Sequence, residues 1–451
     1  MGISRRDFVK AGAGAFFVAS SERLFGADAP SSRVRFAIAG CREGGRGYTV
    51  LDNALKVPGV DIVCVCDVDS RAMDFAAEAV RGRTGRAPRK ERDFRKVLEM
   101  GDVDGVISVT PDHFHAYSAV MAMRAGKHVY VEKPCAYCPR ECEVIRETWR
   151  ETGMCFQMGS QRRSRPGYIQ ALREVREGNL VGETRYAKCW YNTRRGPIGR
   201  GKAAAVPGWL DWDLWQGPAP REAFRDNVVH YNWHWFRKWG TGECGNNSIH
   251  FVDVARWCLG AEWPERVVSS GGRYFQPAGQ DWEWPDTQTV GMEFPGGKLI
   301  TWEGTSCVNA NPYMGVGTGC MVYGEKGTLY FMEGTEVRLY DGDGKFVREW
   351  GTMPKADRRD VIDFSNRAGG GPADSTAFHF ANLVDCIRAN APERAASNAD
   401  IGTKSTMLAL LGNISLTTGE AIRVDPATGR MLNKGAAESL WGREYAKGWE
   451  I

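Results

Sequence analysis

The stretch VRFAIAGCREGGRGYTVL, residues 34–51, decides the fold of this chain. Residues 34–39 are apolar enough for a buried parallel strand, a glycine-rich turn follows at 40–47, and a helical pattern begins at Tyr48. Glycines in such a turn let the backbone approach a pyrophosphate, which N–H groups and the positive end of the helix dipole then hold. The spacing is irregular, because the usual G-x-G-x-x-G is met only with two inserted residues. An ordinary glycine turn therefore stays an alternative.

A carboxylate follows where an acceptor for a ribose hydroxyl is expected. Asp67 ends the apolar run at 61–66 and lies 20 residues after the last glycine of the turn, Gly47. A carboxylate would repel a 2′-phosphate, so NAD is favoured over NADP. Arg71 could accept that phosphate and keeps NADP as an alternative. The competing carboxylate, Asp69, is expected to cap a helix or a loop.

Two further strands bring a lysine to the same edge of the sheet. An apolar run at 105–109 leads into Thr-Pro-Asp-His-Phe-His at 110–115 and then into a helix. The next strand, 127–131, carries Glu-Lys-Pro at 132–134. Strand and helix alternate throughout 34–156, which predicts a doubly wound parallel sheet. Ligands of such sheets lie beyond the carboxyl ends of the strands, so the lysine can donate to a substrate beside the expected dinucleotide.

Four motifs occur in a familiar order along the chain. They are Ala-Gly…Gly-Gly-Arg-Gly at 39–47, Thr-Pro-Asp-His-Phe-His at 110–115, Ala-Gly-Lys-His-Val-Tyr-Val-Glu-Lys-Pro at 125–134 and Gly-Asn-Asn-Ser-Ile-His-Phe-Val-Asp at 245–253. With these motifs the chain resembles the glucose–fructose oxidoreductase / inositol dehydrogenase (Gfo/Idh/MocA) family over nearly everything after residue 33. The resemblance implies an NAD(P)-binding Rossmann domain, placed here at 33–156, and a C-terminal α+β domain at 157–451.

The pattern after residue 163 fits that second domain. A helix is expected at 167–177 and two more at 376–390 and 400–418, which should pack near the nucleotide domain. Strand-like stretches lie at 183–192, 266–274, 288–294, 298–305, 319–323, 328–332 and 336–340. Successive strands without intervening helices predict a large, mainly antiparallel sheet with one face against helices. The resemblance implies that the open face serves oligomerisation, so a homodimer or homotetramer is expected.

Composition limits the partners. The chain has 451 residues, enough for two domains, and 43% of them are hydrophobic. A net charge of +4 with dispersed basic residues indicates no nucleic-acid partner.

Among 13 cysteines, the spacing at 135, 138 and 142, with Cys155 beyond, could suggest a metal or iron–sulfur site. No second Cys or His pair completes such a cluster, so no metal is expected and the cysteines are interpreted as small hydrophobes. Disulfides stay an alternative in an oxidising compartment.

Residues 1–29 are expected to be a targeting segment rather than part of the fold. Ser4–Lys10 has a twin-arginine signature, an apolar segment follows at 11–20, and Ala-Asp-Ala at 27–29 could be a cleavage site. The apolar segment is too short to span a bilayer. We therefore expect export to the periplasm or its equivalent, with no membrane attachment once the signal is removed.

A helix at 245–257 carries the expected proton-transfer group. The resemblance implies that His250 is the general base and that Lys133 binds the same substrate oxygen beside the nicotinamide. Histidine suits this role because its ordinary pKa of about 6.5 lets it accept and return a proton near neutral pH. Many family members have Asp four residues before this histidine, where this chain has Asn246, so the details of the proton relay are open. Asp253 could orient His250 or could serve only helix packing.

Residues 207–239 are rich in aromatic side chains, which stack on the faces of pyranose rings. Trp209, Trp212 and Trp215 are expected to serve packing. The site candidates are Lys133 and His250 for catalysis; Asn246, Asp253, Arg162, Trp235 and Arg237 for substrate; and Gly40, Gly44, Gly45, Arg46, Gly47, Asp67, Thr110, Pro111, His113, His115, Glu132 and Lys133 for the nucleotide.

The function expected first is oxidation of a ring hydroxyl of a sugar, glycoside or related polyol by hydride transfer to NAD or NADP. One alternative is an NAD-dependent glycosidase that acts through transient oxidation and elimination. Another is a sugar–sugar oxidoreductase or redox isomerase with tightly bound nucleotide. A nonenzymatic sugar or nucleotide sensor is the third, and the pairing of Lys133 with His250 argues against it.

Overall fold

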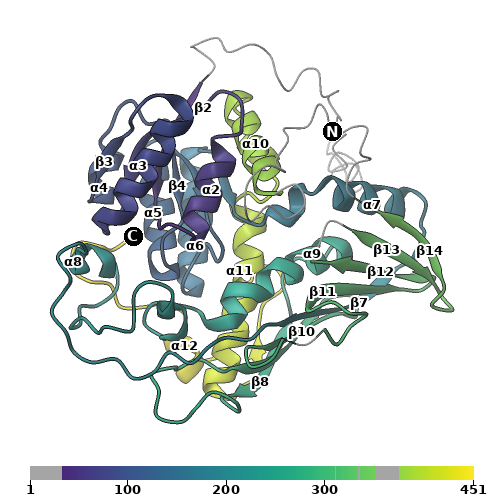
Figure 1. The fold of residues 1–451 in the computed structure, drawn as a ribbon. Coiled ribbons are helices and arrows are strands. Elements are labelled where there is room, and N and C mark those ends of the chain that lie inside the picture. The colour runs from purple at the N-terminus through teal and green to yellow at the C-terminus, as the bar shows by residue number, and fades with distance from the viewer. Residues whose placement is uncertain (1–32, 310, 334–335, 352–374) are drawn as a thin grey trace, which may run out of the picture. The chain divides into compact units, whose positions relative to one another are not determined.

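The computed structural model describes residues 33–309, 311–333, 336–351 and 375–451. The expected targeting segment at 1–29 lies outside these residues, and its role stays a prediction. The described chain builds two β-sheets, each covered by helices (Figure 1). Within the described residues, no helix is long and apolar enough to cross a membrane.

The first sheet has six parallel strands in the order β3-β2-β1-β4-β5-β6. The strands are β1 (Val34–Ala39), β2 (Val60–Cys66), β3 (Arg89–Glu91), β4 (Gly105–Ser108), β5 (His128–Val131) and β6 (Phe156–Met158), and the helices between them are α2 (Arg46–Ala54), α3 (Ser70–Thr84), α4 (Phe94–Leu98), α5 (Asp112–Arg124) and α6 (Pro139–Thr152). This strand order is that of a Rossmann fold, and it confirms the predicted doubly wound sheet. Because all strands run the same way, their carboxyl ends meet at one edge.

Local signals in the sequence explain where the helices of this domain begin and end. Asp69 is the N-cap of α3, where its side chain accepts a hydrogen bond from the backbone N–H of Arg71. The predicted capping role of Asp69 is thereby confirmed. Gly85 and Gly153 end α3 and α6 with φ of 73° and 65°, a backbone conformation that glycine adopts at no steric cost.

The second sheet has nine strands in the order β14-β13-β12-β11-β7-β10-β9-β8-β15. The strands are β7 (Thr184–Asn192), β8 (Arg266–Gly272), β9 (Thr287–Phe294), β10 (Lys298–Thr305), β11 (Thr318–Gly324), β12 (Gly327–Met332), β13 (Val337–Asp341), β14 (Phe346–Trp350) and β15 (Ile422–Arg423). Neighbouring strands are antiparallel except β7 and β10, which are parallel. This confirms the predicted large, mainly antiparallel sheet. Strand β14 was not predicted, because four of its five residues are exposed and because apolar and polar residues do not alternate along it.

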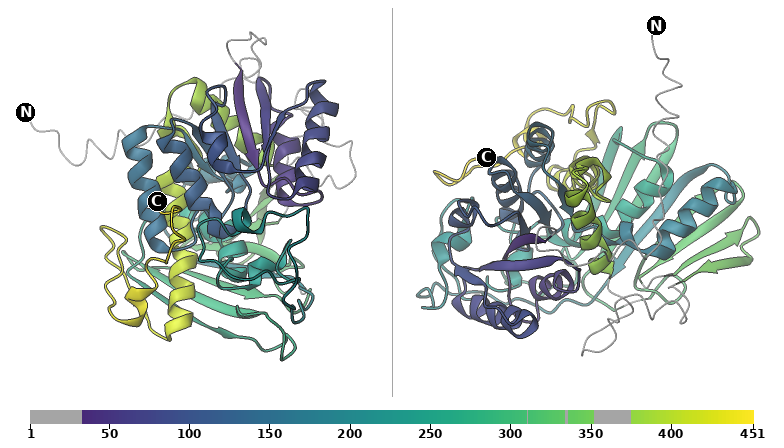
Figure 2. Two further views of the ribbon diagram at one scale, coloured as in Figure 1. Left: turned by 90° about the vertical axis from the view of Figure 1, so that its left-hand side faces the viewer. Right: turned by 90° about the horizontal axis from the view of Figure 1, so that it is seen from above.

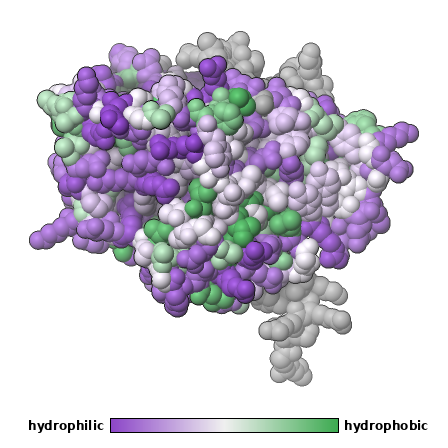
Figure 3. All heavy atoms as spheres, turned by 90° about the horizontal axis from the view of Figure 1, so that it is seen from below, coloured by the Kyte–Doolittle hydropathy of each residue, from purple (hydrophilic) through white to green (hydrophobic). Residues whose placement is uncertain are grey.

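Helices α9 (Ile249–Leu259) and α11 (Ala399–Thr418) lie along one face of this sheet (Figure 1). Helix α7 (Pro166–Glu177) packs at the β13–β14 end. The view from below shows hydrophobic and weakly polar residues gathered inside a hydrophilic border (Figure 3).

Helix α10 (Ser375–Arg388) packs against the Rossmann domain, as expected for the C-terminal helices (Figure 2). Its Phe380 ring lies 5.1 Å from the ring of Phe36 in β1, and both side chains are fully buried. The Rossmann core therefore includes residues more than 300 positions further along the chain.

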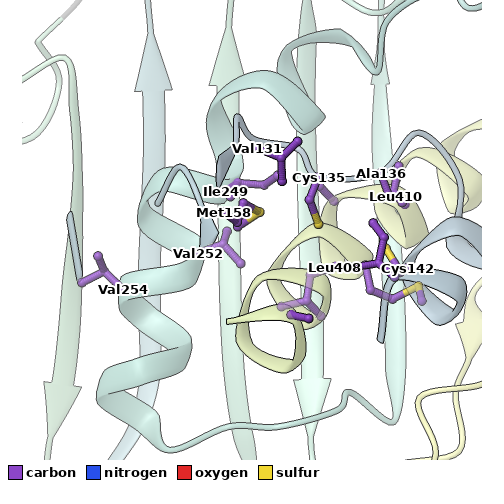
Figure 4. Close-up of a cluster of buried hydrophobic side chains, with 14 of the residues drawn as sticks. Val131, Cys135, Ala136, Cys142, Met158, Ile249, Val252, Val254, Leu408 and Leu410 are labelled. Carbon is purple, nitrogen blue, oxygen red and sulfur yellow. The ribbon is translucent and has the colours of Figure 1, made fainter. Parts of the chain in front are cut away.

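Cysteines of the 135–142 segment lie in an apolar core. Cys135 and Cys142 are fully buried among Val131, Met158 and Leu408 (Figure 4). Burial raises the pKa of the Cys142 thiol well above its ordinary value. These contacts agree with the interpretation as small hydrophobes, and no group of three His, Cys, Asp or Glu able to hold a metal lies within the described residues.

Candidate active site

The glycine-rich turn joins β1 to α2 at the carboxyl edge of the parallel sheet. Gly40 has φ of +86°, and a Cβ there would lie 2.3 Å from the carbonyl oxygen of Val109 at the end of β4. A Cβ on Gly47 would lie 1.8 Å from the carbonyl oxygen of Gly40. Gly45 is the N-cap of α2, whose first residue is Arg46. Only glycines allow this close approach, so the turn fits a pyrophosphate held at the start of α2.

Asp67 lies directly beside this turn. Its carboxylate accepts hydrogen bonds from the backbone N–H groups of Cys41, at 2.7 Å, and Asp69, at 3.0 Å. Burial raises the pKa of Asp67 above its ordinary value. Arg71, which kept NADP as an alternative, is held by two bonds to the Asp69 carboxylate and lies 3.6 Å over the ring of Trp209. The position of Asp67 thus fits a ribose acceptor, and the guanidinium of Arg71 already has partners.

A partly buried ion pair ties the glycine turn to the end of β5. Arg46 Nε lies 2.8 Å from Glu132 Oε1, which also accepts a bond from Tyr130. Burial alone would raise the pKa of Glu132, but the charges of Arg46 and Lys133 hold it below its ordinary value. A Cβ on Gly159 would lie 2.8 Å from Glu132 Oε1, so the carboxylate is closely packed. Glu132 therefore fixes the backbone next to Lys133.

The Lys133 amine lies against the helix that carries His250. Its Nζ donates to the backbone carbonyl oxygen of Asn246, at 2.6 Å, and to the Asn246 side-chain oxygen, at 2.7 Å. Burial lowers the pKa of Lys133 below its ordinary value, against the nearby charges of Glu132 and Asp112. The following peptide bond, to Pro134, is cis. The two oxygens of Asn246 thus hold the amine where a substrate oxygen could also accept from it.

His115 contacts the lysine loop, and Thr110 and Pro111 lie at the junction of β4 and α5. His115 Nδ1 lies 2.6 Å from the carbonyl oxygen of Pro134, and its Nε2 is buried with no partner in the part of the chain that the structure describes. Pro111 is the N-cap of α5, and the Thr110 hydroxyl lies 3.1 Å from that of Ser108. The predicted nucleotide contacts of these three residues stay predictions.

His250 stands at the start of α9. A π-helical turn, η5 (Cys244–Ser248), precedes α9, where the sequence predicted one continuous α-helix. The Nδ1 atom of His250 is buried and has no hydrogen-bond partner among the described residues. Burial and the charges of Arg162 and Lys133 lower the pKa of His250 well below its ordinary value. The imidazole is therefore neutral at pH 7 and able to accept a proton.

Asp253 is buried and bonded to protein groups, which favours the packing role that the sequence left open over a substrate contact. Its carboxylate receives two bonds from Arg163, at 2.7 and 3.0 Å, and one from Ser405, at 2.6 Å. The side chain is 1% exposed, and among the described residues it has no bond to His250. Although it shares a helix with the histidine, its partners come from other segments.

Three further candidates contact other protein groups. His113 is fully buried, its Nε2 lies 3.0 Å from the carbonyl oxygen of Trp215, and burial lowers its pKa to about 3. Trp235 is 1% exposed and stacks on Trp282 with 3.9 Å between ring centroids. These contacts favour packing roles for His113 and Trp235. Arg237 lies over the ring of Trp284 and donates to Thr417, but the residue is exposed, so its predicted substrate contact stays a prediction. Trp212 and Trp215 stack in the core, as expected.

Arg162 lies beside the His250 position. Its guanidinium covers the ring of Phe251 at 4.4 Å and pairs with Glu333 at 3.0 Å. The Nε atom is buried, and no described residue bonds to it. Arg162 is thus still placed to meet a substrate, and that role stays a prediction.

Sequence reasoning missed a polar network around Glu243. Arg195 donates to Glu243, at 3.2 and 3.3 Å, and to the Tyr231 hydroxyl, at 2.6 Å. Asn247 and Ser306 also bond to the Glu243 carboxylate. Glu243 lies three residues before Asn246, so an acidic residue so near the His250 motif was a usable signal. Arg195 lies in a loop without periodicity, so no sequence signal pointed to it.

Comparison with known proteins agrees with this geometry. Residues 34–160 match the model described as an oxidoreductase family with an NAD-binding Rossmann fold. Residues 169–330 match the GFO/IDH/MocA C-terminal domain. Fold and site thus define an NAD-binding oxidoreductase of two domains, and the two matches together span more than half of the chain. The chain belongs to the Gfo/Idh/MocA family.

Curated relatives cover part of the chain. The NAD⁺-dependent scyllo-inositol 2-dehydrogenase of Bacillus subtilis (strain 168) is 32% identical over 53% of this chain and 58% of its own length. The α-N-acetylgalactosaminidase of Shewanella oneidensis is 30% identical over 38% of each chain. The chain thus spans less than two thirds of the length of these relatives. A levoglucosan dehydrogenase structure with NADH and levoglucosan shares the fold, with a TM-score of 0.65 and 18% identity over 87% of this chain and 99% of that one.

Proposed function

We propose that the protein is an NAD-dependent oxidoreductase that removes hydride from a ring hydroxyl of a sugar, glycoside or related polyol. The observation that carries the proposal is the Lys133 amine, held by Asn246 at the carboxyl end of β5, next to His250 and joined through Glu132 and Arg46 to the glycine turn. The names of the relatives, an inositol dehydrogenase and a levoglucosan dehydrogenase among them, support the substrate class.

The chain's own residues suit the two halves of hydroxyl oxidation. The glycine turn and Asp67 would hold the dinucleotide, which when bound supplies a hydride acceptor. Neutral His250 takes the hydroxyl proton, and its low pKa keeps it available as an acceptor at pH 7. Lys133 donates to the same oxygen and stabilises its negative charge as the proton leaves. Arg162, beside His250, would orient a further hydroxyl.

A second function is favoured by the glycosidase among the relatives. The Shewanella oneidensis α-N-acetylgalactosaminidase is 30% identical to this chain over 38% of its length. A glycosidase that oxidises transiently would use the same lysine and nucleotide but give hydrolysis without net redox.

One experiment separates the two functions. Purified protein would be incubated with a panel of methyl glycosides, free sugars and inositols, with and without added NAD. The products would be identified by mass spectrometry. Ketone together with NADH supports the dehydrogenase, and free sugar without NADH supports the glycosidase. A panel that yields neither product contradicts both.

We also propose export, tight nucleotide binding and oligomerisation. The twin-arginine signature in Ser4–Lys10 supports export. Outside the cytoplasm no soluble NAD pool exists to replace a lost nucleotide, so slow release of a buried nucleotide would be required. The apolar gathering on the face in Figure 3 supports association of copies. Fractionation of cells and light scattering of the purified protein test the first and last proposals.

A further inference from the structure

A second histidine lies near the Lys133 amine. His234 belongs to the turn η4 (Asn232–Trp235), and its ring stacks on that of Trp233 with 3.6 Å between centroids. Its Nδ1 lies 2.6 Å from the carbonyl oxygen of Tyr231. A carbonyl oxygen only accepts, so Nδ1 carries the proton and the lone pair is on Nε2. Among the described residues Nε2 has no hydrogen-bond partner, and it is open to a ligand.

Helix α5 anchors the segment that carries His234. The backbone N–H of His113 donates to the carbonyl oxygen of Trp239, and Thr241 donates twice to the Asp112 carboxylate, at 3.0 and 2.6 Å. Gly240 packs directly on the histidine, because a Cβ there would lie 2.6 Å from His234 Cα.

The same turn of α5 anchors the lysine loop. His115 Nδ1 holds the Pro134 carbonyl, the residue after Lys133, at 2.6 Å. One helix end therefore fixes both Lys133 and His234. Because a short turn of helix holds the two loops, their relative position is set by the fold and not by a mobile surface segment.

The electrostatics of His234 agree with this arrangement. The groups whose charges act on His234 are Lys133, Arg195 and His115, while burial is the largest cause that lowers its pKa, to about 3. The charge of Lys133 acts on His250 as well. Both imidazoles are therefore neutral at pH 7, and both lie within range of one amine.

We propose that His234 is a second proton acceptor, which takes the proton from the carbon next to the ketone formed by the first step. The inference rests on the proposed function and deepens it. When a carbinol is oxidised, its carbon gives up a hydride and its hydroxyl gives up a proton. That reaction needs one base, and His250 supplies it. A second neutral imidazole with an open lone pair can act as a base in a later step, in which a second proton leaves the substrate.

The chemistry of an oxidised sugar supplies such a proton. When a carbinol becomes a ketone, the adjacent C–H bond is acidic. The Nε2 atom of His234 takes that proton, the C–H electron pair forms a carbon–carbon double bond, and the carbonyl π pair moves onto oxygen. The Lys133 ammonium stabilises this enolate oxygen. Where an alkoxy group stands on the next carbon, the oxygen pair of the enolate re-forms the carbonyl and the carbon–carbon π pair forms a new double bond to that carbon. The alkoxy group leaves with the carbon–oxygen bonding pair, and its oxygen takes the proton that His234 holds. The substrate class is thus a glycoside or other β-alkoxy sugar.

Deuterium exchange tests the proposal. The probes are methyl D-glucopyranosides oxidised to the ketone at C2, C3 or C4, incubated in D₂O with the purified protein, and exchange beside the ketone is followed by proton NMR. Wild type should exchange at least one probe. The variants His234→Gln and His234→Ala should exchange it about 10²–10⁴-fold more slowly. Both variants should form NADH from the parent glycoside in a single turnover within a few-fold of wild type.

Two further variants complete the comparison. His250→Gln should show the opposite pattern, with NADH formation lost and exchange retained. His128→Gln is the matched control, because His128 lies at the opposite end of β5, where its Nδ1 accepts from the backbone N–H of Cys155, at 3.0 Å. The His128→Gln variant should form NADH and exchange deuterium at the wild-type rates.

The result that overturns the inference is distinct from failure of the proposed function. Wild-type protein that exchanges none of the probes, or His234 variants that exchange at the wild-type rate, refute the role of His234. Wild-type protein that forms neither NADH nor free sugar from any member of the panel of glycosides, free sugars and inositols refutes the proposed function, while the exchange of ketone probes still decides the role of His234.

Discussion

Replacing Asp253 by alanine should destabilise the protein without removing a substrate contact. The Asp253 carboxylate is 1% exposed and pairs with Arg163, whose side chain is 8% exposed, through two bonds; Ser405 supplies a third. Truncation leaves a buried guanidinium without its counter-ion, which costs about 3–5 kcal/mol of unfolding free energy. Replacing both partners, as in Arg163→Met with Asp253→Leu, should cost clearly less, because no unpaired charge is left.

The assay is equilibrium unfolding in urea, followed by tryptophan fluorescence and circular dichroism. Glu78→Ala is the matched control, because Glu78 forms a surface ion pair with Arg81 in which both side chains are more than half exposed. It should leave the unfolding free energy nearly unchanged, because solvent screens an exposed ion pair. Nucleotide affinity should be the same in all variants.

The same pair predicts a dependence on pH. Burial alone would raise the pKa of Asp253, but Arg163 and the hydrogen bonds hold it below its ordinary value. The folded protein thus binds this proton less readily than the unfolded chain, so the stabilisation is present above the ordinary aspartate pKa of about 3.9 and is lost as the pH falls through the lower folded value. An Asp253→Ala variant as stable as wild type, but with a raised substrate KM, would refute this reasoning and return Asp253 to the substrate.

Further predictions concern the nucleotide and the two proton-transfer groups. Asp67→Ala should weaken NAD more than NADP in fluorescence titrations, and an unchanged preference would remove Asp67 from the ribose. Lys133→Ala should lower hydride transfer by about 10²–10⁴-fold in single-turnover kinetics, with nucleotide affinity retained. Because burial and Arg162 lower the pKa of His250, the acidic limb of the pH–rate profile should lie below the ordinary histidine value of about 6.5; a limb at or above that value would contradict the base assignment. Acid-treated purified protein should release a nucleotide visible by its absorbance, and protein that emerges empty and needs added NAD would overturn tight binding.

The sequence by itself determined the fold class and the edge at which the site lies. Strand alternation and glycines with positive φ are local properties, so Gly40 and the run before it were enough to predict the first strand and turn. Lys133 was predicted at a strand end because parallel strands share one carboxyl edge. The same reasoning predicted capping by Asp69, which depends only on the two residues that follow it.

Only the tertiary structure decided which side chains meet. Asp253 pairs with a residue 90 positions away, and Lys133 bonds to Asn246, 113 positions away. His234 is placed beside the lysine because α5 holds both loops, a relation that no periodicity expresses. The sequence predicted that Trp235 stacks on a sugar ring, yet its own ring stacks on that of Trp282. A polar or aromatic side chain acts according to what packs against it, and distant segments supply those neighbours only once the chain has folded.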